Sequence, residues 1–316
     1  MKVHQNIEID GVDYGDRKSR KYSNFCNEGK WNNFIKPLLP VDCTDMTLVE
    51  MGSNAGLFLR LSKEMGFRYV MGIERDKEAY DMSLEYTDAW GIKCDIVNTN
   101  VTENFDFRDI PLADVVLLAN FHYHMIVQDF LVMLDAVEHK TRYCLIVSID
   151  SAPKQHYNTD ARIEKTREYF KNWKEVGVVN PISMEGDSHP RNGMYGILFE
   201  SKLTRVPLDN ILRPDGKEVI LGDSFKRFIE LAKSGVGFDV RKTLYYKKIF
   251  NQKGKKLPEE EIFNLVNGKK EMIRDFVRGR IMKPIIVDKD FKLLDGGTRV
   301  MVAKELGYKS IIVRVL

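Results

Sequence analysis

Short apolar runs and segments of helical period alternate along the first two thirds of the chain. The runs are apolar almost throughout, which predicts strands buried on both faces of a parallel sheet. Between them, apolar residues recur at three- and four-residue spacing, as on one face of a helix. The expected strands are 46–51, 69–73, 94–98, 114–119 and 142–149, and the expected helices are 57–65, 77–90 and 126–139. This order predicts an α/β fold built on a doubly wound sheet.

Two further segments are expected to flank this sheet. Residues 31–39 have apolar side chains at helical spacing and are followed by Pro40, which predicts a lid or flanking helix. The runs 174–182 and 194–200 enclose a polar loop, as a β-hairpin at a sheet edge would. The alternating domain is therefore expected to end near Arg205.

A length of 316 residues favours two domains over one. The expected organisation is an N-terminal arm and lid helix in 1–40, the alternating domain in 41–205, and a smaller α+β domain in 206–316. Two prolines and a glycine in 207–216 suggest a short linker. Residues 1–205 carry 25 Lys and Arg against 31 Asp and Glu, whereas 206–316 carry 24 against 15. An anionic ligand is therefore expected on the C-terminal part.

Composition excludes several classes of protein. Apolar residues make up 43% and charged residues 30% of the chain, which is ordinary for a folded protein. No run reaches the length of a membrane span and the start is too charged for a signal peptide, so a cytoplasmic protein is expected. The four cysteines are scattered, with no CxxC pair and no histidine at zinc-ligand spacing. Reduced thiols and no metal site are therefore expected.

The segment 48–56 places an acid and two glycines where a strand is expected to turn into a helix. Gly52 and Gly56 allow a tight turn and close approach of a ligand, and Glu50 can accept a hydrogen bond from it. Glu74 follows about 20 residues beyond the loop, at the end of the next strand, where an acid binds the two hydroxyls of a ribose. The spacing lacks the GxG of a dinucleotide site, so pyrophosphate binding is disfavoured.

This pattern resembles motif I of the class I S-adenosylmethionine-dependent methyltransferases, which have a Rossmann-like fold, and the resemblance covers 41–205. It implies S-adenosyl-L-methionine as the cofactor and methyl transfer as the activity. Glu74 would bind the ribose hydroxyls and Arg75 would flank the adenine. Asn100, an amide where the family commonly has an acid, would accept a bond from the adenine amino group. The implied cofactor-binding residues are Glu50, Gly52, Ser53, Asn54, Gly56, Glu74, Arg75, Asn100, Val101, Asn120 and Phe121.

The exit of the fourth long strand, 115–125, resembles motif IV of the same family. In that motif an apolar strand is followed by a small residue, an asparagine, an apolar residue and then a histidine, and this segment lies beneath the transferring methyl group. The resemblance therefore implies that Asn120, Phe121 and His122 line the pocket. His122 and His124 are the candidate catalytic residues, because an imidazole with a pKa of about 6.5 can deprotonate a hydroxyl acceptor. The alternative is that these histidines order the loop by hydrogen bonding.

Short motifs bear on the acceptor. The arm, Lys30-Trp31 and the loop 188–191 resemble the branch that contains tRNA wobble-uridine carboxymethyltransferases and sugar or glycan methyltransferases. His189 and Arg191 of that loop either reach over the cleft or are simply exposed. The acidic first half lacks a basic track that would hold RNA, which favours O-methylation of a sugar, glycan or other small metabolite. Nucleic acid is the alternative acceptor.

The C-terminal 34 residues, 283–316, predict strands around a glycine turn that opens a helix. Free backbone N–H groups at such a helix start can hold an anion. The turn resembles the signature of the ParB and sulfiredoxin-like superfamily, where it holds nucleotide phosphates. The sulfiredoxin cysteine would fall at Gly297 and the histidine of related members at Thr298, so both are missing. The implied anion-binding residues are Asp295, Gly296, Gly297, Thr298 and Arg299.

Residues 241–256 carry seven basic residues with interleaved aromatics. A phosphate-rich ligand would favour this composition, and a solvated helix face followed by a lysine-rich loop is the alternative. A nucleotide or phosphorylated ligand is therefore a possible partner of the C-terminal domain. The expected role of this domain is binding, and a bifunctional methyltransferase-kinase with a ParB-like phosphotransferase is the alternative function.

Overall fold

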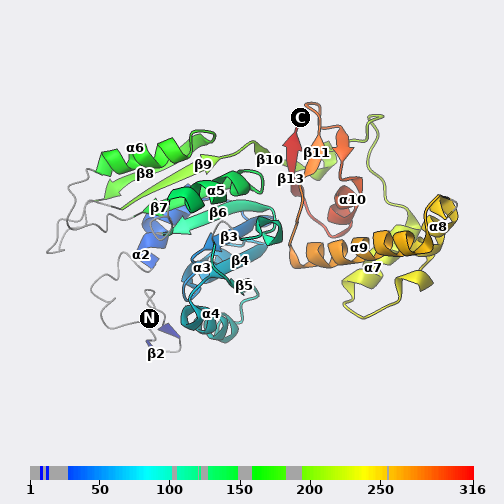
Figure 1. Ribbon diagram of the computed structural model, residues 1–316, viewed down its shortest axis with the longest axis horizontal. Coiled ribbons are helices and arrows are strands. Elements are labelled where there is room, and N and C mark those ends of the chain that lie inside the picture. Colours follow the sequence, from blue (N-terminus) through cyan, green and yellow to red (C-terminus); the bar gives the residue numbers. More distant parts are fainter. Residues whose placement is uncertain are drawn as a thin grey trace. The chain divides into compact units, whose positions relative to one another are not determined.

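The computed structural model describes residues 8–9, 12–13, 28–101, 105–119, 121, 127–148, 159–182, 194–254 and 256–316. The chain divides into two compact units, Met1–Leu203 and Thr204–Leu316. The predicted boundary between 205 and 206 lies two residues from this division. Figure 1 shows a layered sheet with helices in the first unit and a small sheet beside a group of helices in the second.

The first unit contains a mixed sheet of seven strands in the order β5-β4-β3-β6-β7-β9-β8. Its first five strands are parallel, and β9 then runs antiparallel to both β7 and β8. The strands are β3 (Thr47–Met51), β4 (Tyr69–Glu74), β5 (Asp95–Asn98), β6 (Ala113–Ala119), β7 (Thr141–Ser148), β8 (Lys174–Ile182) and β9 (Met194–Glu200). The predicted doubly wound α/β sheet with a terminal hairpin is confirmed, and the strand bounds agree within one residue.

Helices cover both faces of this sheet, and a separate apolar cluster fills each face. On one face, α3 (Leu57–Glu64) packs with the segment around Trp31. On the other, α5 (Val127–Glu138) and α6 (Thr159–Tyr169) pack through residues such as Phe130 and Ile163. The helix α4 (Lys77–Ala89) connects β4 to β5. Strands covered on both faces explain why the runs in the sequence are apolar throughout.

The segment predicted as one helix over 31–39 differs in type. A short turn, α2 (Glu28–Lys30), leads into the π-helix η2 (Trp31–Ile35) and then the 3-10 helix η3 (Lys36–Leu38). Pro37 has no N–H to donate, so an α-helical ladder cannot continue through it. Trp31, Phe34 and Ile35 are buried against the sheet. The segment is thus a flanking element of the core rather than a regular lid helix.

The second unit has a four-stranded sheet in the order β10-β13-β11-β12. The strands are β10 (Leu203–Pro207), β11 (Ile285–Val287), β12 (Leu293–Asp295) and β13 (Ser310–Val315), and the main helices are α7 (Asp223–Lys233), α8 (Leu244–Lys253), α9 (Glu259–Arg278) and α10 (Gly297–Glu305). β11 pairs parallel with β13 and antiparallel with β12. The unit therefore mixes a small sheet with helices, as an α+β domain does.

The predicted linker at 207–216 is wrong. Leu208, in the 3-10 turn η6 (Leu208–Asn210), is 2% exposed and donates its backbone N–H to the Lys309 carbonyl at 3.0 Å. Ile211 is fully buried, and Leu212 forms β-bridges to Glu218 and Lys292. Pro207 therefore ends a strand and Pro214 lies in a turn inside the second unit, and neither belongs to a flexible connection.

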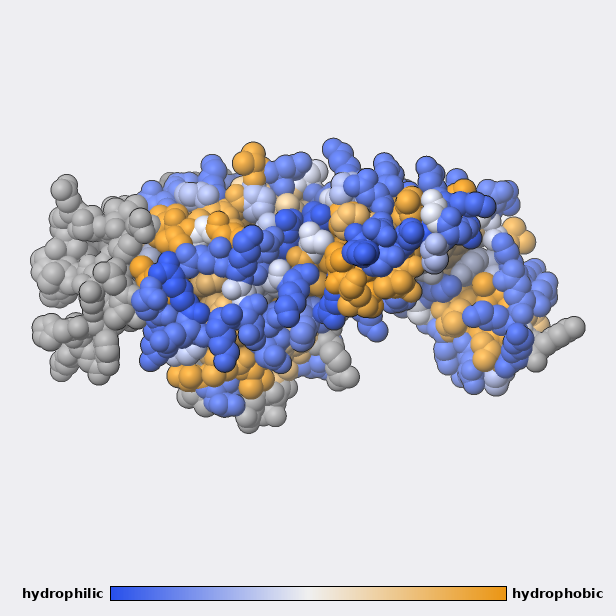
Figure 2. Space-filling model, turned by 90° about the horizontal axis from the view of Figure 1, so that it is seen from above, coloured by the Kyte–Doolittle hydropathy of each residue, from blue (hydrophilic) through white to orange (hydrophobic). Residues whose placement is uncertain are grey.

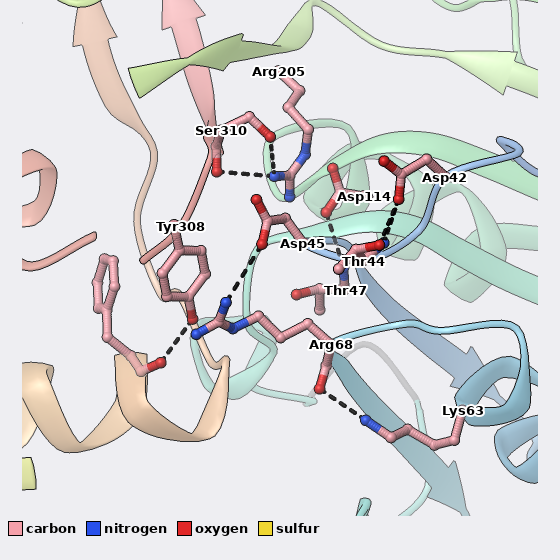
Figure 3. Close-up of polar contacts among 11 residues, drawn as sticks. Asp42, Thr44, Asp45, Thr47, Lys63, Arg68, Asp114, Arg205, Tyr308 and Ser310 are labelled. Carbon is pink, nitrogen blue, oxygen red and sulfur yellow. Dashed lines mark hydrogen bonds and ion pairs between the residues drawn. The ribbon is translucent and has the colours of Figure 1, made fainter. Parts of the chain in front are cut away.

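Polar contacts tie the amino ends of the central strands together (Figure 3). The buried Asp114 carboxylate at the start of β6 accepts the Thr47 backbone N–H of β3 at 2.9 Å. The Lys63 ammonium donates to the Arg68 carbonyl at 2.8 Å. It also donates to the Phe67 carbonyl at 2.8 Å, and the two bonds close the turn after α3. In the second unit, Arg205 donates to the Ser310 carbonyl at 3.0 Å. The carboxyl ends of the parallel strands in the first unit, where open α/β sheets bind ligands, lie at the opposite edge of that sheet.

The described surface carries scattered apolar side chains among polar ones. Figure 2 shows, on one face, hydrophobic patches separated by hydrophilic surface. Among the described helices, none is long and apolar enough to cross a membrane.

Candidate functional site

The loop between β3 and α3 uses an unusual backbone. Gly52, Asn54 and Gly56 all have positive φ angles, of 76°, 50° and 87°. The backbone N–H groups of Gly52 and Ser53 both donate to the Ile73 carbonyl of β4, at 2.8 and 3.1 Å. The loop is therefore fixed against the neighbouring strand, and glycine serves where a side chain would be strained.

Gly52 has a second reason to lack a side chain. A Cβ atom at this position would lie 2.8 Å from Cδ2 of Phe121. Phe121 follows β6 and packs at the edge of the core cluster. The close approach that the sequence assigned to a ligand is thus made by this aromatic ring. Phe121 lies against the glycine loop, and its role in lining a pocket stays a prediction.

Glu74 ends β4 and holds the loop from the side. Its Oε2 accepts the Asn54 backbone N–H at 2.8 Å, and its Oε1 accepts that of Asp76, also at 2.8 Å. The side chain is 6% exposed. Each carboxylate oxygen has further lone pairs, so both can still accept bonds from hydroxyl groups. Glu74 is therefore both a support of the loop and a ready acceptor beside it.

Glu50 is unusual among the described acids of the first unit. It is 1% exposed, and its Oε2 is buried without a hydrogen-bond partner among the described residues. Burial raises the pKa of this carboxyl well above its ordinary value, Lys30 opposes that rise, and Glu74 adds to it. A buried acceptor without a donor costs free energy. Such an atom beside a glycine loop points to a ligand that supplies the missing donor.

Asn54 repeats this feature. Its side-chain Oδ1 is also buried without a hydrogen-bond partner among the described residues. Its backbone is left-handed, a conformation that asparagine tolerates better than most residues. Two orphaned acceptors, Glu50 Oε2 and Asn54 Oδ1, therefore occur within five residues of one loop. Both match the donors of a ligand with amino and hydroxyl groups.

Lys30 belongs to the surroundings of the site, although the sequence placed it only in a short motif of the arm. It is 5% exposed, and its Nζ lies 5.7 Å from the centre of the Phe58 ring. Trp31 stacks on the same ring at 6.2 Å between centroids. Lys30 acts electrostatically on Glu50. A lysine next to a buried tryptophan was the only signal in the sequence.

The residues predicted to bind the adenine are less buried than Glu50 and Glu74. Arg75 and Asn100 are exposed, whereas Val101 is 5% exposed and belongs to the core. Asn98, which the sequence analysis did not single out, donates through Nδ2 to the carbonyls of Glu74 and Arg75, at 2.9 and 3.2 Å. Asn98 therefore fixes the end of β4, where Glu74 is presented.

Several predicted residues lie outside the described part of the chain. These are Asn120, His122, His124, His189 and Arg191. The candidate general bases therefore stay predictions. Among the described residues, no group of three or more His, Cys, Asp or Glu side chains is placed to hold a metal ion.

A hollow of about 280 Å³ lies elsewhere in the first unit. It is lined by Trp31, Asn32, Lys36, Leu61, Glu64 and Met65. The last three belong to the end of α3 and the residue after it, whereas the glycine loop meets the start of α3. The hollow is therefore distinct from the candidate site.

The C-terminal glycine turn has the predicted form. Gly296 has a φ of 100° and precedes α10, which begins at Gly297. Arg299, however, turns back over the glycine: it donates to the Pro284 carbonyl at 2.8 Å and to the Asp295 carboxylate at 2.6 Å. Its guanidinium thus ties β11 to β12. Thr298 is half-buried. Anion binding by these residues stays a prediction.

Comparisons with known proteins find similarity to solved structures. No family model matches the chain, and no curated protein matches it. Among solved structures, TehB from Haemophilus influenzae is similar with 13% identity and a TM-score of 0.43, over 58% of this chain and 65% of TehB, slightly less than two thirds of that protein.

Two further structures are similar over about half of this chain. One is a SAM-dependent methyltransferase from Aquifex aeolicus, with 16% identity over 54% of this chain and 92% of that one, at a TM-score of 0.40. The other is the N-methyltransferase NodS from Bradyrhizobium japonicum WM9, with 14% identity over 49% and 85%, at a TM-score of 0.38.

Proposed function

We propose that the first unit binds S-adenosylmethionine at the glycine loop and transfers its methyl group. The observation that carries this proposal is the buried Glu50 Oε2, an acceptor without a donor, at the carboxyl end of a central parallel strand. Ligands of doubly wound sheets bind at this edge. When bound, the cofactor supplies an electrophilic methyl group on a sulfonium sulfur.

The described residues divide the work of binding between them. Glu50 offers a carboxylate to the amino group of the methionine part, and Glu74 offers its remaining lone pairs to the ribose hydroxyls. Asn54 Oδ1 supplies a third acceptor. Phe121, packed against Gly52, forms an apolar wall that excludes water from the loop. These acceptors fit a cationic, hydroxyl-rich ligand and offer nothing to a pyrophosphate.

We propose further that the acceptor is an oxygen of a sugar, glycan or other small metabolite. His122 or His124, which follow β6 in sequence, would take the proton of the acceptor hydroxyl as it attacks the methyl group. The acidic balance of residues 1–205 supports an acceptor without a phosphate backbone. Nucleic acid is the alternative acceptor.

Transfer of a labelled methyl group tests the proposal. Protein and labelled S-adenosylmethionine are incubated with a cell extract, and methylated products are identified by mass spectrometry. Glu50→Gln removes the charge with little change of shape, so we expect at least a tenfold loss of labelling. Glu85→Gln, at an exposed position of α4, is the matched control and should label as the wild type does.

Three results would count against the proposal. No transfer by the wild-type protein to any component of the extract would contradict methyl transfer. Equal labelling by wild type and Glu50→Gln would contradict the role of Glu50. Label recovered in RNA rather than in small molecules would replace the proposed acceptor by the alternative one.

A further inference from the structure

The helix α8 has two chemically different sides. Tyr245 and Tyr246 are 8% and 5% exposed and face the other helices of the second unit. The Tyr245 ring lies 4.7 Å from Phe225 of α7, between centroids, and its hydroxyl accepts a bond from Lys269 of α9 at 2.7 Å. The Thr243 side chain caps the helix by accepting the Tyr246 backbone N–H at 3.1 Å. The helix is therefore a firmly anchored platform.

The other side of α8 is basic and exposed. Lys247 and Lys248 lie there, and Lys253 and Lys256 follow at the end of the helix and beyond it. None of these four lysines forms an ion pair with a residue in the described part of the chain. The stretch 241–256 contains no acidic residue at all. Its positive charge is thus left for a partner.

Glu259, the first acid after this stretch, is directed to the packed side instead. Glu259 begins α9, lies 3.8 Å from Arg241 and contacts the Tyr246 hydroxyl at 3.5 Å. Arg241 itself lies over the Phe263 ring, 4.0 Å from its centre. These contacts occupy Arg241 but leave the lysines of α8 uncompensated.

An exposed aromatic ring lies among the lysines. Phe250 is 39% exposed, and it stands three residues from both Lys247 and Lys253, a spacing that puts all three on adjoining parts of the helix surface. Its ring is stacked on Tyr246 at 6.1 Å with an interplanar angle of 23°. The buried tyrosine therefore fixes the orientation of the exposed ring. A ring held this way, flanked by two cations, matches a base between two phosphates.

We propose that the second unit binds single-stranded nucleic acid on this face of α8. Phe250 stacks on an unpaired base, Lys247 and Lys253 bind the adjacent phosphates, and Lys248, further round the helix, binds a phosphate farther along the strand. A membrane surface fits less well, because the apolar side of α8 is buried within the unit and only Leu244 and Phe250 are apolar and exposed. A duplex fits less well because its bases are already stacked. The inference does not depend on the proposed methyl transfer.

Fluorescence anisotropy with the full-length protein tests this inference. The probe is a fluorescein-labelled oligouridylate of about 12 nucleotides, within the site size of single-strand binders. Three lysine–phosphate contacts predict that the affinity falls roughly 20-fold between 50 and 200 mM salt. Lys247→Gln combined with Lys253→Gln should lower the affinity at 50 mM salt at least tenfold and make the salt dependence shallower.

Matched variants separate local contacts from general charge. Lys217→Gln combined with Lys289→Gln removes the same charge from exposed positions outside α8, and it should leave the affinity within twofold of wild type. Phe250→Ala should weaken binding about fivefold or more without changing the salt dependence, whereas Phe250→Tyr should retain it. Unchanged circular dichroism shows that each variant is folded.

Three outcomes would overturn the inference. The first is no binding of oligouridylate at 50 mM salt, and the second is an equal loss of affinity in the two double variants. The third is competition by vesicles containing anionic lipid, or by duplex of the same length, that is stronger than competition by unlabelled oligouridylate.

Discussion

Burial of Glu50 and its proposed role in binding favour different protonation states of its carboxyl group when no ligand is bound. Its carboxyl is almost fully buried and one oxygen has no donor in the described part of the chain, yet binding of a cation requires the ionised form. Burial raises its pKa well above the ordinary value of 4.5, even though Lys30 acts in the opposite direction. The ionised carboxylate thus costs the ligand-free protein stability, which binding recovers.

Replacement of Glu50 therefore changes stability in a defined direction. Because the folded pKa exceeds the unfolded one, the stabilising contribution of this carboxyl is fully present below pH 4.5 and is lost as the pH rises through the folded value. At pH 8, Glu50→Gln should melt on the order of 2–4 °C above wild type, and the gap should close as the pH falls towards 5. Thermal melts over this pH range measure it; a variant that melts lower at pH 8 contradicts the burial of an ionised acid.

Gly52 is constrained by its neighbour as well as by its own backbone. An alanine there combines a positive φ with a Cβ at 2.8 Å from the Phe121 ring. Gly52→Ala should cost about 2–4 kcal/mol in wild type but only about 1–2 kcal/mol in a Phe121→Ala background, where strain alone remains. Urea denaturation of the wild type, the two single variants and the double variant measures these free energies of unfolding as a double-mutant cycle. Additive losses would show that the two residues do not touch.

At the scale of elements, the segment η2–η3 is positioned by two glycines of the hairpin. A Cβ on Gly196 of β9 would lie 2.9 Å from the backbone oxygen of Phe34, and one on Gly177 of β8 would lie 2.9 Å from the end of the Leu38 side chain. A backbone atom in a buried turn cannot yield, whereas a side-chain methyl can rotate. The hairpin and the flanking segment therefore depend on each other mainly through Gly196.

These two glycines give a matched pair of variants. Gly196→Ala should destabilise the protein by about 2 kcal/mol and speed hydrogen exchange of the amides in 31–38, because the segment must lift from β9. Gly177→Ala should cost less than about 1 kcal/mol and leave that exchange unchanged. Equal effects of the two substitutions would contradict the rigid contact at Phe34.

Sequence pattern was sufficient for the sheet but not for every element around it. The runs behind β3, β4, β6 and β7 are apolar throughout because both faces are covered, and their short length between segments of helical spacing identifies them as strands. The π-helical segment at 31–35 shares its spacing with an α-helix, so period could not distinguish them. The prolines in 207–216 suggested a linker. The sequence could not show otherwise, because the burial of Leu208 and Ile211 depends on residues far away in the chain.

The same limit applies within the site. Glycines and acids at Gly52, Gly56 and Glu74 were identified because their spacing reflects local backbone geometry. Lys30 and Asn98 were missed because their roles depend on the tertiary fold: Lys30 acts electrostatically on Glu50, and Asn98 bonds to the end of β4. In the second unit, the bond from Arg299 to the carbonyl of Pro284, 15 residues away, could not be read from the local pattern, and anion binding by Arg299 stays a prediction.

Across the whole molecule, the acidic and basic excesses of charge lie in different parts of the chain. Residues 1–205 carry an excess of acids and hold their key carboxylates in buried positions, whereas 206–316 carry an excess of bases that is largely exposed. Salt screens exposed charges far more than buried ones. Between 50 and 200 mM salt, S-adenosylhomocysteine affinity should therefore change less than twofold while oligouridylate affinity falls roughly 20-fold. Parallel titrations measure both; equal salt dependence would contradict this separation.

Calorimetric titration of S-adenosylhomocysteine into wild type, Glu50→Gln and Glu85→Gln tests the central claim most directly. Wild type and Glu85→Gln should bind with micromolar affinity, Glu50→Gln at least tenfold more weakly, and none should bind NAD. Below the raised pKa of Glu50, wild-type affinity should fall about tenfold per pH unit, because binding must then release a proton. Absence of binding by wild type, binding of NAD instead, or undiminished binding by Glu50→Gln would contradict a methyl-donor site built on this carboxylate.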